Sequence, residues 1–219
     1  LNEIDFFLLP STAKKFQQDI LNLLNIPKNK RLSSSKFRHV HAETVIAVDH
    51  PWVIKNNASK EIHNIPTWII DWLKLQFIKK SEINNSLPKK IYINRKDAPL
   101  KHRNQRSIIN ENEVEEFLQK KGYVSLTLSE FNFIQQVNLF NNAESIVGLH
   151  GAGFANVIFC SPKTNILELK SSNAGDTIKN LSLKNNLIYN GISIEANERS
   201  YQLGHIEVPL SSLKEKINQ

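Results

Sequence analysis

The sequence predicts an α/β protein built on parallel, doubly wound sheets. Short runs rich in β-branched and aliphatic residues alternate with amphipathic helical stretches along most of the 219 residues. Hydrophobic residues make up 40% and charged residues 22% of the chain, which is ordinary for a globular protein with a sizeable core. Two glycines, Gly151 and Gly153, stand between one expected strand and the next helix, as a tight βα corner requires.

Residues 1–83 are expected to be the remainder of one α/β domain. Apolar residues at helical spacing predict its helices, and β-branched runs predict its strands. Trp68 and Trp72 are assigned to core or inter-domain packing on the second helix. We expect strands at 5–9 and 44–48, helices at 13–24 and 67–78, and a loop at 26–35.

Residues 84–219 are expected to form a second domain, entered through the linker at 84–88. Strands and helices alternate strictly here, which implies right-handed crossovers and a parallel sheet. Strands are predicted at 90–93, 123–128, 145–149, 166–169 and 187–189, and helices at 112–121, 131–141, 154–159 and 176–184, with a short closing helix at 211–216.

Composition narrows the class of protein. No apolar run is long enough to span a membrane, and the first residues have no signal-peptide character. Cys160 is the single cysteine, which excludes an internal disulfide and fits a reducing cytoplasm. The chain starts at Leu1 and contains no methionine, so we expect it to be the C-terminal part of a longer protein.

The formal charge of +7 points to anionic partners: nucleic acid, an anionic membrane surface or phosphorylated substrates. Much of the excess comes from Lys89 and Lys90 and from the segment 95–106. A cytoplasmic protein with this charge can also associate with the inner face of a membrane.

The corner His150-Gly-Ala-Gly153 is a candidate phosphate site. Backbone N–H groups at the start of a helix lack intrahelical partners, and the helix dipole is positive there. Asn156 stands where a dinucleotide fingerprint has its third glycine, which favours a nucleotide or nucleotide-sugar over NAD. Glu168, at the expected end of the next strand, could accept hydrogen bonds from ribose. The structural alternatives are a turn histidine at 150 and a carboxylate paired with a lysine at 168.

Arginines follow the expected strand 90–93. Arg95 lies at its carboxyl end, where open α/β sheets place their ligand crevice, and Arg103 and Arg106 follow in a loop. Arginine suits bidentate phosphate contacts. Asn110 and Glu111 precede the next helix. The alternative is a solvated basic surface or nucleic-acid patch, although the aromatic residues of a single-strand platform are missing.

Candidates for a general base lie in the first domain. His39 and His41 alternate along an extended segment, and Asp49 ends the expected strand 44–48. Alternating histidines share one face and could also bind a metal, but no third ligand is evident. Ordinary surface roles are the alternative for all three.

Taken together, an ordered set of motifs resembles glycosyltransferase family 61. The set covers residues 91–169 closely and 1–78 loosely. It comprises Ile91-Tyr-Ile-Asn-Arg95, Arg106 with Asn110-Glu111, Gly122-Tyr123, Gln135-Gln136 before Leu139-Phe140, and Ile146-Val-Gly-Leu-His-Gly-Ala-Gly-Phe-Ala-Asn156 with Glu168-Leu169. Two departures are the absent upstream aromatic-histidine-tryptophan motif and Phe154 in place of leucine.

The resemblance implies a GT-B architecture of two Rossmann-like domains, the first incomplete here. It further implies an inverting hexosyl- or pentosyltransferase that uses a nucleoside diphosphate sugar, a carbohydrate or glycoconjugate acceptor and no obligatory metal, in surface or capsular polysaccharide synthesis. Arg95, Arg103, Arg106, Asn110, Glu111, His150, Gly151, Ala152, Gly153, Asn156 and Glu168 would bind the donor. A nucleic-acid-binding protein and a non-catalytic nucleotide-sugar-binding domain are the other readings.

Overall fold

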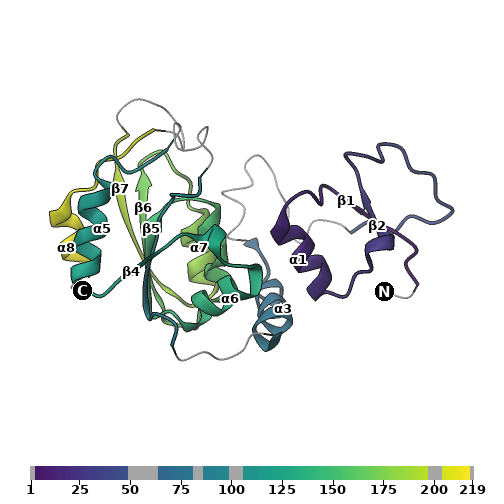
Figure 1. Ribbon diagram of the computed structural model, residues 1–219, viewed down its shortest axis with the longest axis horizontal. Helices are drawn as coiled ribbons and strands as arrows, with labels where there is room; N and C mark the ends of the chain where they lie inside the picture. The colour runs from purple at the N-terminus through teal and green to yellow at the C-terminus, as the bar shows by residue number, and fades with distance from the viewer. Residues whose placement is uncertain (1–2, 49–63, 81–85, 99–105, 197–203, 218–219) are drawn as a thin grey trace. The chain divides into compact units, whose positions relative to one another are not determined.

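The computed structural model describes residues 3–48, 64–80, 86–98, 106–196 and 204–217 (Figure 1). By compactness the chain divides into two units, residues 1–50 and residues 51–219. None of the helices in these described ranges is both long and apolar enough to cross a membrane.

In its described residues, 3–48, the first unit contains two short parallel strands with one α-helix between them. Strand β1 (Phe7–Leu9) leads into helix α1 (Lys15–Leu23), then a 3-10 turn η1 (Lys28–Lys30) and strand β2 (Arg31–Ser33). β1 and β2 pair in parallel. The backbone N–H of Lys14 donates to the Gln17 side chain (3.0 Å), so Gln17 caps the helix start.

One expected strand in this unit is wrong. Residues 44–48 form no strand, and Val48 is 94% exposed. The second strand, β2, lies instead within the run 26–35 that the sequence predicts as a loop. Arg31 explains the difference: its guanidinium donates to the carbonyl of Ile26 and to the Gln18 side chain of α1, which fixes this segment beside the helix.

The second unit is organised around a five-stranded parallel sheet. Its order is β4-β3-β5-β6-β7, and every neighbouring pair is parallel. This confirms the mixed α/β class and the doubly wound sheet. The strands are β3 (Lys90–Ile93), β4 (Val124–Leu126), β5 (Ser145–Leu149), β6 (Asn165–Ser171) and β7 (Ile188–Ile194).

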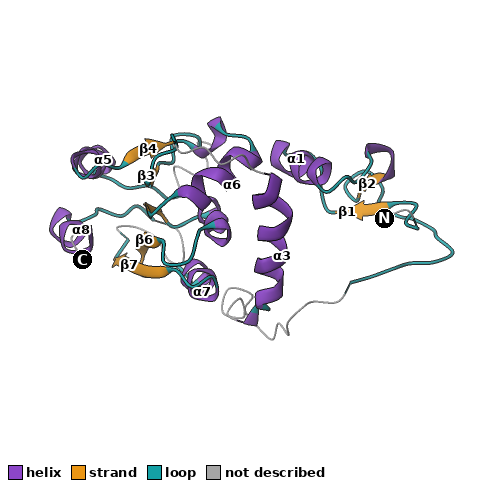
Figure 2. Cartoon of the chain, turned by 90° about the horizontal axis from the view of Figure 1, so that it is seen from below, coloured by secondary structure: helices purple, strands orange, loops and turns teal. Residues whose placement is uncertain are grey.

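Helices cover both faces of this sheet (Figure 2). On one face lie α5 (Glu111–Lys120) and α8 (Leu210–Ile217), which pack their apolar residues against the strands in one buried cluster. On the other lie α6 (Phe133–Asn142), α7 (Thr177–Lys184) and the 3-10 helix η5 (Ala152–Phe159). A short turn η4 (Leu128–Glu130) precedes α6, and Asn132 caps α6 by accepting from the backbone of Gln135 (2.9 Å).

Helix α3 (Thr67–Phe77) and the turn η3 (Ile78–Lys80) that follows it belong to the second unit. The Phe77 ring packs edge-on against Phe133 (5.0 Å) and Phe159 (6.2 Å). The sequence assigns this helix to a first domain that ends at residue 83, whereas compactness divides the chain between residues 50 and 51. Trp68 and Trp72 are exposed rather than buried in the core, because Ile70 and Phe77 supply the buried face.

Two details of the second unit matter for the site. The element after β5 is the 3-10 helix η5 and not an α-helix. Strand β6 continues to Ser171, so Glu168 lies inside the strand and not at its end. Strand β7 runs to Ile194, five residues beyond its predicted end at 189, and the other expected elements from residue 90 onward are confirmed within two residues or so of their predicted bounds.

Candidate functional site

The candidate site lies where the strand order of the sheet reverses. In chain order, the first strand of this sheet is β3; the chain adds β4 on one side of it and β5 on the other. Connections therefore leave the carboxyl ends of β3 and β5 in opposite directions, and open α/β sheets bind ligands in the crevice this creates. Arg95 follows β3 and His150 follows β5, so the topology brings these two predicted residues to one place.

Asn94 fixes the direction in which the chain leaves β3. This buried residue donates from its backbone N–H to Leu126 (3.1 Å) and from its side-chain amide to Ser125 (3.0 Å). Its side-chain oxygen accepts from the Thr127 hydroxyl (2.9 Å) and from the backbone N–H of Lys96 (3.2 Å). The residue between Asn94 and Lys96, Arg95, is thereby held at the sheet edge.

Two guanidinium groups converge on Gly151. A Cβ placed on this glycine would lie 3.5 Å from Nη1 of Arg95 and 3.5 Å from Nη2 of Arg106. The Arg95 Nη1 atom is buried and has no hydrogen-bond partner among the described residues. Arg106 directly precedes Ser107, whose carbonyl accepts from the N–H of Ile206 (3.0 Å) beside the short parallel bridge between Ile108 and Ile206.

Both guanidinium groups are partly buried, and burial lowers the pKa of each. Burial lowers the pKa of Arg95, against the opposing effect of Asp97 and Glu111. Burial and the positive charge of Arg95 lower the pKa of Arg106 to about 10, so Arg106 remains a cation at neutral pH. Two cations held this close favour an anion between or beside them.

The glycine corner adds backbone donors to these cations. The first internal bond of η5 runs from the N–H of Phe154 to the carbonyl of Gly151 (3.0 Å), so the N–H groups of Ala152 and Gly153 precede it. Gly151 is extended, with φ 167°, a conformation open to any residue. The turn therefore does not require a glycine at this position. Because Gly151 has no side chain, the space beside the two guanidinium groups stays open.

His150 and Glu168 form a buried pair. His150 Nδ1 lies 2.5 Å from Glu168 Oε1, and the Tyr189 hydroxyl donates to Glu168 Oε2 (2.6 Å). Glu168 is 0% exposed, so both of its oxygens face protein groups. This geometry argues against the ribose contact that the sequence suggests for Glu168, and its partners are not the lysine of the structural alternative.

Three other predicted site residues have structural partners. Asn110 pairs with the backbone of Val208, donating from its amide and accepting at its oxygen (both 2.9 Å), which anchors the segment that holds Arg106. Glu111 accepts from the buried Tyr92 hydroxyl (3.0 Å). Asn156 donates to Gln136 (3.0 Å) and joins η5 to α6.

The four remaining candidates fall outside the described part of the second unit. Arg103 and Asp49 lie outside the described residues. His39 and His41 are exposed in the first unit. Within the described ranges, no group of three or more His, Cys, Asp or Glu side chains could hold a metal ion.

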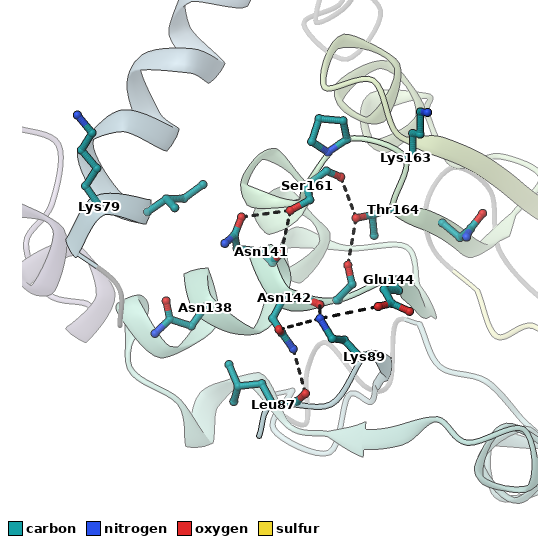
Figure 3. A pocket seen from close by; sticks show the side chains of 14 residues that line it. Lys79, Leu87, Lys89, Asn138, Asn141, Asn142, Glu144, Ser161, Lys163 and Thr164 are labelled. Atoms are coloured by element: carbon teal, nitrogen blue, oxygen red, sulfur yellow. Dashed lines mark hydrogen bonds and ion pairs between the residues drawn. The ribbon is translucent and has the colours of Figure 1, made fainter. Parts of the chain in front are cut away.

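A separate hollow of about 680 Å³ lies at the opposite edge of the sheet (Figure 3). It is lined by residues at the amino ends of the strands, among them Lys89, Glu144 and Asn165. Lys89 is already bonded to Asn142 (3.0 Å) and lies 3.8 Å from Glu144. We place the candidate site at the carboxyl edge instead, because the arginines and the glycine corner lie there.

Sequence reasoning missed two residues that shape the site, Asn94 and Tyr189. Asn94 directly precedes Arg95 at a strand end, which is a usable signal for a turn-forming side chain. Tyr189 lies on the last strand of the sheet and has no such signal, since its contact with Glu168 follows only from the pairing of β6 with β7.

Comparison with known proteins gives one family. A sequence model of the family described as Glycosyltransferase 61 matches residues 5–167, well over half of the chain. The match includes Arg95, Arg106 and the His150–Gly153 corner. No curated protein matches the chain.

Proposed function

The chain belongs to glycosyltransferase family 61 and is therefore a glycosyltransferase, and we propose that it transfers a sugar from a nucleoside diphosphate sugar to a hydroxyl acceptor with inversion. One observation carries the choice of donor: Arg95 and Arg106 converge on the backbone of Gly151, and Arg95 Nη1 has no partner among the described residues. A diphosphate supplies two adjacent anionic groups for these two guanidiniums.

In the proposed reaction the acceptor oxygen forms a bond to the anomeric carbon. The bond from that carbon to the diphosphate oxygen breaks, and its electron pair stays on the diphosphate. The acceptor proton passes to a general base, for which His39, His41 and Asp49 remain the candidates. Because the acceptor attacks from the side opposite the leaving group, inversion follows.

The arginines act on the charge that develops as the diphosphate leaves. Fixed donors aimed at this charge stabilise the transition state more than the ground state. We propose that Arg95, Arg106 and the N–H groups of Ala152 and Gly153 supply these donors, with His150 as a further one. With two cations at the site, the protein would not need a metal ion to neutralise the diphosphate.

The biological setting is proposed on the family alone. Members that act on surface or capsular polysaccharides use carbohydrate or glycoconjugate acceptors, and we propose the same class here, with a GT-B arrangement of the complete enzyme. A cytoplasmic location, at or near the inner face of a membrane, fits a formal charge of +7.

The test is thermal stability of the chain against a panel of nucleoside diphosphates, with and without EDTA. A ligand that binds only the folded state at 100 times its Kd stabilises by about 2.7 kcal/mol. We expect at least one nucleoside diphosphate to raise the melting temperature with or without EDTA, and Arg95→Ala to weaken its binding by about 10- to 100-fold, the loss of charge-assisted hydrogen bonds.

Lys120→Ala is the matched control, because it removes one exposed positive charge from the end of α5, away from the glycine corner. It should bind like the parent. Equal losses in Arg95→Ala and Lys120→Ala would mean that only the overall charge matters. Stabilisation by single-stranded oligonucleotides and by none of the nucleoside diphosphates would favour a nucleic-acid-binding protein instead.

A further inference from the structure

Three side chains on adjacent strands form a hydrogen-bonded chain that ends beside the candidate diphosphate site. Tyr189 on β7 donates to Glu168 on β6, and Glu168 contacts His150, which follows β5. We propose that Glu168, held by the Tyr189 hydroxyl, is a positioning residue that fixes His150 with its ring proton on Nδ1 and leaves Nε2 as the nitrogen that meets the diphosphate. This inference rests on the proposed function.

The register of the sheet builds this chain. Glu168 pairs with Gly148 on β5 and with Gly191 on β7, so a glycine flanks it on each side. A Cβ on Gly191 would lie 2.9 Å from the Tyr189 hydroxyl oxygen. Gly191 therefore leaves the space in which that hydroxyl reaches Glu168.

The direction of each hydrogen bond follows from chemistry. Burial and the charge of Glu168 raise the pKa of Tyr189, so its hydroxyl stays protonated and donates. An ionised carboxylate can only accept, so the proton between Glu168 Oε1 and the imidazole belongs to Nδ1. Nε2 is then the ring nitrogen that does not face Glu168.

The positive charge near His150 explains why a glutamate is needed at position 168. The guanidiniums of Arg95 and Arg106 lie beside Gly151, the residue that follows His150, and the charge of Glu168 acts on Arg106. A protonated imidazole next to two arginines would be an uncompensated third cation. Glu168 compensates it, so His150 can take up a proton and donate from Nε2 when an anion arrives.

The position of His150 also fixes which partner it serves. It directly precedes Gly151, the residue on which the arginines converge, so it lies on the side of the leaving diphosphate. The acceptor attacks from the opposite side. His150 is therefore a donor to the diphosphate and not the base that activates the acceptor.

The experiment measures the tautomer first and needs no ligand. The intact chain, labelled with ¹⁵N in its seven histidines, is observed by long-range ¹H–¹⁵N NMR at alkaline pH, and His150→Gln assigns the signal. We expect the Nδ1–H tautomer in the parent. In Glu168→Gln, the Tyr189 hydroxyl keeps the amide oxygen, so the amide NH₂ faces Nδ1 and the ring should switch to the Nε2–H tautomer.

The second readout is affinity for inorganic pyrophosphate. The parent and Glu168→Gln should differ by about tenfold, because Nε2 faces the anion in a different protonation state in the two chains. Tyr189→Phe, which keeps the ring, should retain the Nδ1–H tautomer. The titration of pyrophosphate itself is common to all variants and cancels in these comparisons.

The outcomes separate the two proposals. An Nε2–H tautomer in the parent, or an unchanged tautomer in Glu168→Gln, overturns the positioning role whatever pyrophosphate does. The expected tautomers with equal pyrophosphate affinities in parent and Glu168→Gln overturn the link to the ligand. Failure of the parent to bind pyrophosphate or any nucleoside diphosphate overturns the proposed function, even where the tautomers are as expected.

Discussion

At Gly151, a substitution can weaken ligand binding with little effect on the stability of the fold. Its backbone is extended, so alanine fits without strain, and the added Cβ would meet the two guanidiniums at ordinary contact distance, 3.5 Å. That Cβ would occupy the space that a phosphate oxygen needs. We expect Gly151→Ala to change the free energy of unfolding by less than about 0.5 kcal/mol and to weaken diphosphate binding by about tenfold or more.

Gly148 is the matched control for this prediction. Its Cβ would lie 3.0 Å from the carbonyl oxygen of Ile93 and 3.0 Å from the Phe154 ring, so the packing of β5 must shift. Gly148→Ala should cost about 1–3 kcal/mol of unfolding free energy, the usual cost of overpacking. Urea denaturation and a nucleoside diphosphate titration measure both quantities. Parent-like binding by Gly151→Ala would place the phosphate elsewhere.

Part of this site is accessible to sequence reasoning because strand ends can be predicted. Arg95 and His150 follow two apolar runs, and parallel strands bring their carboxyl ends to one edge of the sheet, where the structure brings both residues near Gly151. The role of Glu168 is not accessible in this way. The sequence places Glu168 at the end of a strand, where it could bind a ligand. In the structure β6 continues to Ser171 and pairs with β7, so Glu168 is buried and contacts His150.

At the level of elements, helix α3 shows how an apolar face can mislead. Trp68 and Trp72 are its largest apolar residues, yet Trp68 is 61% exposed and Phe77, 1% exposed, packs against two phenylalanine rings. We expect Phe77→Ala to cost about 3–5 kcal/mol of unfolding free energy, the usual range for a buried phenylalanine. Trp68→Ala should cost about 0.5 kcal/mol or less.

Urea denaturation of the two variants tests this assignment. The midpoint should fall in Phe77→Ala and stay near the parent value in Trp68→Ala. Reversed results would mean that the tryptophan face of α3 is covered in the folded protein and that the inter-domain role suggested by the sequence is correct.

Element prediction succeeds where a hydrophobic period coincides with pairing. From residue 90 onward each expected strand finds a parallel neighbour, so local pattern and sheet agree. Residues 44–48 have the β-branched pattern of a strand but no pairing partner in the described part of their unit, and β2 forms at Arg31–Ser33 from a polar segment. In β2, the hydrogen bonds that the Arg31 side chain donates to Ile26 and Gln18 matter more than the weak strand preference of this polar segment.

At the scale of the whole molecule, we predict that the unit of residues 51–219 binds the donor by itself and that sugar transfer needs both units. Every residue of the candidate site that the structure brings together, from Arg95 to Tyr189, belongs to the unit of residues 51–219. This unit has its own sheet, covered by helices on both faces, and lies within the size range of independent domains. A fragment of residues 51–219 should therefore fold cooperatively and bind the selected nucleoside diphosphate within about threefold of the complete chain.

The same fragment should lose sugar transfer if the base lies among His39, His41 and Asp49, since all three belong to the other unit. Calorimetric titration and a transfer assay with the selected donor measure the two properties, and the fragment with Arg95→Ala controls for binding at another place. A fragment that folds but does not bind would mean that residues 1–50 complete the donor site. Transfer by the fragment at the rate of the complete chain would remove those three residues as candidates, because the base must then lie in the unit that holds the diphosphate.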